Sequence, residues 1–189
     1  KLILSIFLFN ILNLQAADVY WIGTNSNDWN DNANWSFSSG GPSNTNAPES
    51  DDIAIFDGNG NINCNINTNV NVRGYNIDNG YTSTITQNSG IRINVGVNNF
   101  NQSDGTFIGG DDQIKINGYF NLTGGSFNST SSNFIIGRSV NINLTFFNHS
   151  GGTFNHNNGI VEFEMFSPAY ANRVYTVDVL PTTKFNNIV

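Results

Sequence analysis

FNQSDGTF at residues 100–107 recurs as FNLTGGSF at 120–127 and as FNHSGGTF at 147–154. The three copies begin 20 and then 27 residues apart. Repeats at such intervals are typical of solenoids, in which each repeat buries its apolar face only by stacking on its neighbours. The repeat therefore predicts a solenoid. Within it, Phe100, Phe120 and Phe147 should form one interior stack, and Phe107, Phe127 and Phe154 another.

The residues around these copies alternate between apolar and polar. Residues 62–72 read INCNINTNVNV, which is the pattern of a strand with one face buried. Similar runs return along the chain, separated by corners rich in Gly and Asn, residues that tolerate sharp bends. Short strands and a repeat near 20 residues favour an all-β, right-handed parallel β-helix over a meander. We expect the alternating asparagines to face solvent, namely Asn63, Asn65, Asn67, Asn69 and Asn71.

The chain divides into three parts by composition. Residues 1–17 resemble a signal peptide, with one basic residue, an apolar run too short to form a stable transmembrane helix, and small residues at Ala16 and Ala17. Residues 17 to about 50 lack strand periodicity, and residues 18–56 are predicted to form an N-terminal cap. Residues 57–189 are predicted to be β-helix rungs, incomplete at the C-terminal end. This organisation predicts a secreted or outer-surface protein with no membrane span once the signal is removed.

Charge and cysteine content exclude several classes of function. Only 11% of the residues are charged and the net charge is −7, with no cluster of Lys or Arg, so no nucleic-acid partner is expected. The 15 Phe, 6 Tyr and 3 Trp are too much aromatic surface for a chain that stays unfolded. The single cysteine, Cys64, allows neither an internal disulfide nor a cysteine-based metal site, and it is expected in the core.

Several motifs carry a family resemblance. Trp21-Ile-Gly, Trp29 and Asn34-Trp35, followed by Pro48 and by the run Asp52-Ile-Ala-Ile-Phe56, resemble the start of exported bacterial β-helix surface proteins. That group includes autotransporter-like passengers and repeat adhesins of Bacteroidota. Residues 80–87, 151–163 and 182–188 are similar to its rungs. The resemblance implies a large cell-surface or secreted protein, and it carries no catalytic signature.

Two surfaces are candidates for ligand binding. Trp21, Trp29 and Trp35 could stack on sugar rings, or they could cover the open end of the first rung as a cap. The longer second interval between the repeats suggests an insertion, which in solenoids often lies on the binding face. We place this insertion in the polar loop formed by Asn128, Ser129, Thr130, Ser131 and Ser132.

Residues that could carry chemistry are sparse, and no catalytic residue, metal site or cofactor is predicted. Asp57 begins a segment like a calcium loop, but Ile62 and Thr68 stand where such a loop needs Gly and Glu. The Asp51-Asp52 and Asp111-Asp112 pairs are interpreted as corner residues, and His149 and His156 as surface imidazoles. Glu162 and Glu164 share one face of a strand but lack the opposed geometry of a glycosidase pair.

These observations favour a non-catalytic scaffold resembling an adhesin, which binds glycans or cell-surface components. The alternative is a fragment of a carbohydrate-active β-helix enzyme, a polysaccharide lyase or glycoside hydrolase, with its active site beyond this segment. A third possibility, an ice-binding solenoid, requires threonine ladders across several rungs. Thr82, Thr84 and Thr86 supply one row, and no neighbouring rung is predicted to repeat it.

Overall fold

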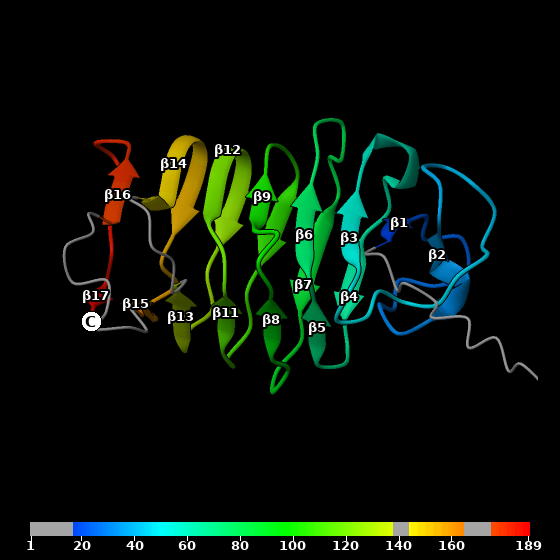
Figure 1. Ribbon diagram of the computed structural model, residues 1–189, viewed down its shortest axis with the longest axis horizontal. Helices are drawn as coiled ribbons and strands as arrows, with labels where there is room; N and C mark the ends of the chain where they lie inside the picture. Colours follow the sequence, from blue (N-terminus) through cyan, green and yellow to red (C-terminus); the bar gives the residue numbers. More distant parts are fainter. Residues whose placement is uncertain (1–16, 138–143, 165–174) are drawn as a thin grey trace, which may run out of the picture.

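The computed structural model describes residues 17–137, 144–164 and 175–189. The predicted signal segment lies outside this part of the chain, except for Ala17. The described residues form short strands that stack side by side along the long axis of the molecule (Figure 1). The N-terminal segment in blue and cyan lies at one end of the stack, and the C-terminal strands in red lie at the other.

The strands form three walls, each a parallel ladder. The first wall contains β1 (Asp18–Trp21), β3 (Ile53–Phe56), β6 (Gly74–Ile77), β9 (Phe100–Gln102), the start of β12 (Phe120–Asn128), part of β14 (Leu144–Asn155) and β16 (Tyr175–Val179). The second wall contains β4 (Cys64–Ile66), β7 (Thr84–Gln87), β10 (Thr106–Ile108) and the ends of β12 and β14. The third wall contains β5 (Val70–Val72), β8 (Ile93–Val95), β11 (Ile114–Ile116), β13 (Asn133–Ile136), β15 (Ile160–Phe163) and β17 (Asn187–Ile188).

The chain visits the three walls in the same order on every turn. It therefore builds a parallel β-solenoid of about five turns, which confirms the predicted fold class. The first two walls belong to one 11-stranded sheet, because β12 and β14 bend from one wall into the next, and the third wall is a six-stranded sheet. Two 3₁₀ turns, η1 (Asn32–Asn34) and η2 (Gly58–Gly60), and strand β2 (Trp35–Ser36) complete the described elements.

Stacked aromatic rings fill the interior. Phe107, Phe127 and Phe154 occupy matching positions in the second wall, with successive ring centroids 5.0 and 5.9 Å apart and nearly parallel planes. Phe100, Phe120 and Phe147 form the corresponding stack in the first wall, with centroids 5.6 and 4.9 Å apart. All six rings are buried, so both predicted stacks are confirmed.

The bends of β12 and β14 depend on glycine. Gly125 and Gly152 have φ angles of 70° and 76°, in the left-handed region that side chains disfavour. They also lie on top of one another in successive turns, and a Cβ atom at Gly152 would be 2.5 Å from the carbonyl oxygen of Gly125. The Gly-Gly pairs of the repeat are thus required both by backbone conformation and by the close approach of two rungs.

The alternating asparagines face outward, as predicted. Asn63, Asn69 and Asn71 are exposed and Asn65 and Asn67 are partly exposed, whereas Cys64 and Ile66 between them are buried. The predicted pattern is wrong at Ile62, which remains 41% exposed. Ile62 follows η2, before the strand begins, so the alternation of β4 does not apply to it.

The prediction that residues 128–132 are an insertion is wrong. Phe134 follows Phe127 by seven positions, as Ile114 follows Phe107 on the preceding turn, and these residues pair in register. The seven additional residues of the longer repeat fall instead between Ile136 and Phe147. Of that connection, residues 138–143 lie outside the described part of the chain.

Replacement of Phe127 by Ala should lower the free energy of unfolding by about 3 to 5 kcal/mol, because a fully buried ring is lost from the middle of a stack. Urea denaturation of the purified chain measures this change. Phe37→Ala is the matched control, since Phe37 is 54% exposed and its truncation should change stability little. Equal effects of the two substitutions would contradict the aromatic core.

Candidate functional site

The three tryptophans lie inside the N-terminal cap. Trp21, Trp29 and Trp35 are almost fully buried, and the rings of Trp21 and Trp29 both pack edge-on against that of Trp35. Two of the indole N–H groups are also committed within the fold: Trp21 donates to the carbonyl oxygen of Ile62, and Trp35 donates to that of Trp29. The indole faces are thus not available to sugar rings, which corrects their prediction as a binding surface and favours the cap.

The cap extends the hydrogen-bonded ladders of the first turn. β1 pairs in parallel with β3 in the first wall, and the backbone around Trp29 bonds to Asn65 at the edge of the second wall. The Trp29 ring then stacks on Tyr75, with centroids 5.8 Å apart. The part of the predicted cap from Asp18 to Ser36 therefore covers the end of the aromatic interior, whereas Ile53–Phe56, also predicted as cap, is a strand of the first wall.

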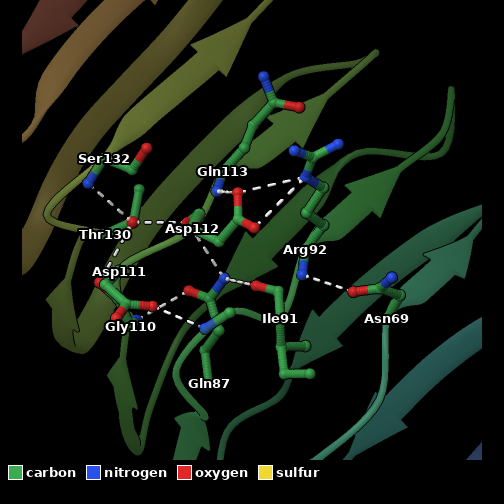
Figure 2. A network of polar contacts seen from close by, with 11 residues as sticks. Asn69, Gln87, Ile91, Arg92, Gly110, Asp111, Asp112, Gln113, Thr130 and Ser132 are labelled. Atoms are coloured by element: carbon green, nitrogen blue, oxygen red, sulfur yellow. Dashed lines mark hydrogen bonds and ion pairs between the residues drawn. The ribbon is translucent and has the colours of Figure 1, made fainter.

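The candidate loop at residues 128–132 is a structural corner between the second and third walls. Ser129 and Thr130 are buried, Asn128 and Ser132 are partly exposed, and Ser131 is exposed. Figure 2 shows Thr130 donating its hydroxyl group to the carbonyl oxygen of Asp112 on the preceding turn, at 2.6 Å. Thr130 therefore contributes to turn-to-turn packing, and the prediction that it belongs to a recognition surface is wrong.

A buried glutamine performs the same role two turns earlier. The Gln87 amide donates to the carbonyl oxygens of Ile91 and Asp112 and accepts from the Gly110 N–H (Figure 2). These backbone groups lie in corners between strands, where no neighbouring strand supplies their hydrogen bonds. Polar side chains thus satisfy buried backbone groups at this edge of the solenoid.

The second wall carries the clearest candidate site, a row of hydroxyl groups on its outer surface. Thr84, Thr106, Ser126 and Thr153 pair in register on four successive turns, and their side chains alternate with the buried residues of the same strands. We call these four residues the hydroxyl row. Adjacent members are one rung, or about 4.8 Å, apart. None of the four hydroxyl groups makes a hydrogen bond to the described residues.

The three-threonine row at residues 82–86 is not repeated on the next rung, as predicted, because Ile108 pairs with Thr86. Only its middle position continues from turn to turn, through the pairing of Thr84 with Thr106. The hydroxyl row, with one member on each of four turns, was not predicted. The signal was present in the repeat itself, because Thr106, Ser126 and Thr153 each immediately precede the last phenylalanine of their copy.

The outer surface of the first wall carries an asparagine ladder whose members bond to one another. Asn76, Asn101, Asn121 and Asn148 pair in register. The Asn101 amide donates to the Asn76 side-chain oxygen at 2.9 Å, and the Asn121 amide donates to that of Asn101 at 2.7 Å. These amides stabilise the stack of turns, so they have fewer groups to offer a ligand than the hydroxyl row has.

The third wall carries the charged candidates for chemistry. Glu164 forms an ion pair with Lys115, two turns away, at 2.7 Å, and this pair spans the nearly buried side chain of Ile135. Glu162 extends from the same wall. The arrangement fixes Glu164 in a structural contact.

The histidines do not form the pair of surface imidazoles that was predicted. His149 is 3% exposed and points inward, where Nδ1 bonds to the hydroxyl of Thr183 and Nε2 to the carbonyl oxygen of Gly152. His156 accepts a hydrogen bond from the Asn158 N–H. Within residues 17–137, 144–164 and 175–189, no three His, Cys, Asp or Glu side chains converge as a metal site would require.

Two aspartates have pKa values displaced in opposite directions. Loss of hydration against the first wall raises the pKa of Asp78, and the nearby carboxylates of Asp57 and Asp18 raise it further. Asp111 accepts hydrogen bonds from the Ser89 hydroxyl and the Gly90 N–H, at 2.6 and 2.7 Å, and these bonds lower its pKa. The folded structure therefore disfavours the charged form of Asp78 and favours the charged form of Asp111.

Comparisons with protein-family models, with curated proteins and with solved structures gave no significant match to this chain. Among the described residues, no helix has the length and apolar character needed to cross a bilayer. Function must therefore be argued from the outer surfaces of the solenoid.

Thr130→Val should lower the free energy of unfolding by about 1 to 2 kcal/mol, because the isosteric change removes a buried donor to the Asp112 carbonyl oxygen. Ser131→Ala, at the exposed neighbouring position, is the control and should have a smaller effect. Thermal and urea unfolding provide the measurement. If Thr130→Val left stability intact but abolished attachment to a ligand, the structural role of this corner would be refuted.

Asp78→Asn should raise the melting temperature at neutral pH and have little effect near pH 3. The raised pKa means that the folded state binds more protons than the unfolded state, so this carboxyl reduces stability as the pH rises above the ordinary aspartate range. Asp111→Asn should do the opposite: the stability that its lowered pKa provides at neutral pH is lost as the pH falls. Melting curves from pH 3 to 7 test both signs, and shifts in the same direction at pH 7 would contradict this assignment.

Proposed function

We propose that this chain is a secreted or surface-exposed β-solenoid scaffold that attaches, without catalysis, to glycans or other cell-surface components. The proposal is supported chiefly by the hydroxyl row. It repeats one polar group on each of four turns, and none of these groups has a hydrogen-bonding partner among the described residues. A repeated array of this kind suits binding through many equivalent weak contacts.

Energetics favour attachment that depends on multiple contacts. A single neutral hydrogen bond contributes only about 1 kcal/mol, and an isolated sugar would therefore bind weakly. Contacts along one rigid wall act together, so their combined strength grows with the number of rungs engaged. The apolar run at residues 1–17 and the resemblance to exported β-helix surface proteins support the extracellular setting.

The alternative function is that of a carbohydrate-active enzyme fragment. Glycoside hydrolysis requires two carboxyl groups that face each other across the bound sugar. Glu162 and Glu164 alternate with Phe163 on a single strand segment, and Glu164 is engaged by Lys115. This geometry favours a structural role for both glutamates.

The purified chain should bind to immobilised polysaccharide and release no sugar from it. The expected result is retention that long soluble chains reverse and monosaccharides do not, with no new reducing or unsaturated ends in the presence or absence of calcium. Retention on polysaccharide beads and a reducing-end assay measure the two properties.

Glu162→Gln and Glu164→Gln serve as controls and should leave retention unchanged. Release of sugar ends by the wild-type chain, abolished by either substitution, would overturn the scaffold proposal and establish the enzyme alternative.

A further inference from the structure

The outer surface of the second wall carries two rows of side chains. The first is the hydroxyl row, and the second lies two residues further along each strand, where its members also pair in register from turn to turn. We call the two rows together the second-wall face. Its nine residues are Thr84, Thr106, Ser126 and Thr153 in the first row, and Asn65, Thr86, Ile108, Asn128 and Asn155 in the second.

The second-wall face contains no charged residue, unlike the third wall, where Lys115 and Glu162 project outward. The chain as a whole carries a net charge of −7. An acidic polysaccharide approaching this face would therefore meet repulsion from the rest of the molecule and no compensating positive group. A neutral polysaccharide has no such electrostatic penalty, so the absence of charge on this face favours a neutral ligand.

The groups on this face match the chemistry of sugar hydroxyls. Each Ser or Thr hydroxyl both donates and accepts, as sugar hydroxyls do, and the row's hydroxyls are not committed to the described fold. Ile108 is 37% exposed in the middle of the second row and provides an apolar contact for the face of a sugar ring. The first-wall asparagines, by comparison, bond to each other.

The spacing of the face adds a geometric requirement. Successive hydroxyls lie about 4.8 Å apart along the solenoid axis, and the two rows are about 7 Å apart along the strands. The rung spacing is comparable to the advance of one ring in an extended β-linked glycan. A chain running parallel to the axis can thus place one sugar on each rung, whereas a strongly coiled glycan cannot follow the row.

We propose that the second-wall face binds a neutral, extended, β-linked polysaccharide whose chain runs along the solenoid axis. This inference rests on the proposed attachment function and assigns it a face, a class of ligand and a direction.

The experiment compares the migration of the purified chain in native gels that contain either hydroxyethyl cellulose, which is neutral and extended, or alginate, which is acidic. Affinity for the neutral polymer should be at least about tenfold higher. Thr106→Val and Ser126→Ala should each weaken it by about fivefold, the loss expected for one neutral hydrogen bond.

Matched lysine substitutions test the assigned face. Thr106→Lys should abolish retardation by the neutral polymer, whereas Asn71→Lys, on the outer surface of the third wall, should leave it unchanged. Circular dichroism and melting curves must show that each variant remains folded. If Thr106→Val, Ser126→Ala and Thr106→Lys all bind the polysaccharide with wild-type affinity, the face assignment is wrong but the attachment function survives.

Two further outcomes would overturn the inference. Stronger binding to alginate than to the neutral polymer would refute the charge argument. The second outcome is that the wild-type chain shows thermal hysteresis and ice shaping, that Thr106→Val loses both, and that neither chain binds a glycan. This result would show that the rows order water, and it would also overturn the proposed attachment to glycans.

Discussion

The parallel, in-register hydrogen bonding between successive turns is the constraint on which the rest of the structure depends. It sets each residue directly above its counterpart, one strand spacing away. Inside, this arrangement stacks Phe107, Phe127 and Phe154 face to face at 5.0 and 5.9 Å. Outside, the same geometry aligns Asn76, Asn101 and Asn121 into a bonded ladder and Thr84, Thr106 and Ser126 into a row. The core and the candidate binding surface are therefore two products of one register.

The sequence allowed the interior to be predicted, because burial restricts the residues that can occur there. The phenylalanine positions and the burial of Cys64 followed from periodicity alone. The location of the seven additional residues did not, since the repeat interval gives only a total length and the corners are all polar. The inward positions of Gln87 and His149 were also missed, because their burial is compensated by hydrogen bonds to backbone groups and, for His149, to the Thr183 hydroxyl. These partners depend on how other turns of the chain fold.

The candidate site was harder to predict than the core for a related reason. Sequence reasoning selected distinctive residues, the tryptophans and the polar loop. Trp35 closes the cap and Thr130 holds a corner, so both have structural roles. The hydroxyl row consists of common residues that become distinctive only when turns are superimposed. Side chains on the outer surface of a solenoid are not constrained by packing in the core. Repetition of one residue type there from turn to turn, as at Thr106, Ser126 and Thr153, therefore indicates a binding surface better than the type of any single residue.

The cap has a consequence for assembly. An uninterrupted stack of parallel strands with like side chains in contact has the arrangement of a cross-β fibre, whose exposed edges recruit further strands. In this protein the ladder of the first wall ends at β2, a strand of two residues that pairs antiparallel with β1, and Trp21, Trp29 and Trp35 fill the space beneath. Because β2 has only two residues, it leaves an incoming strand little edge to pair with at that end of the first wall. The N-terminal segment thus protects this end of the first wall from edge-to-edge association with another chain.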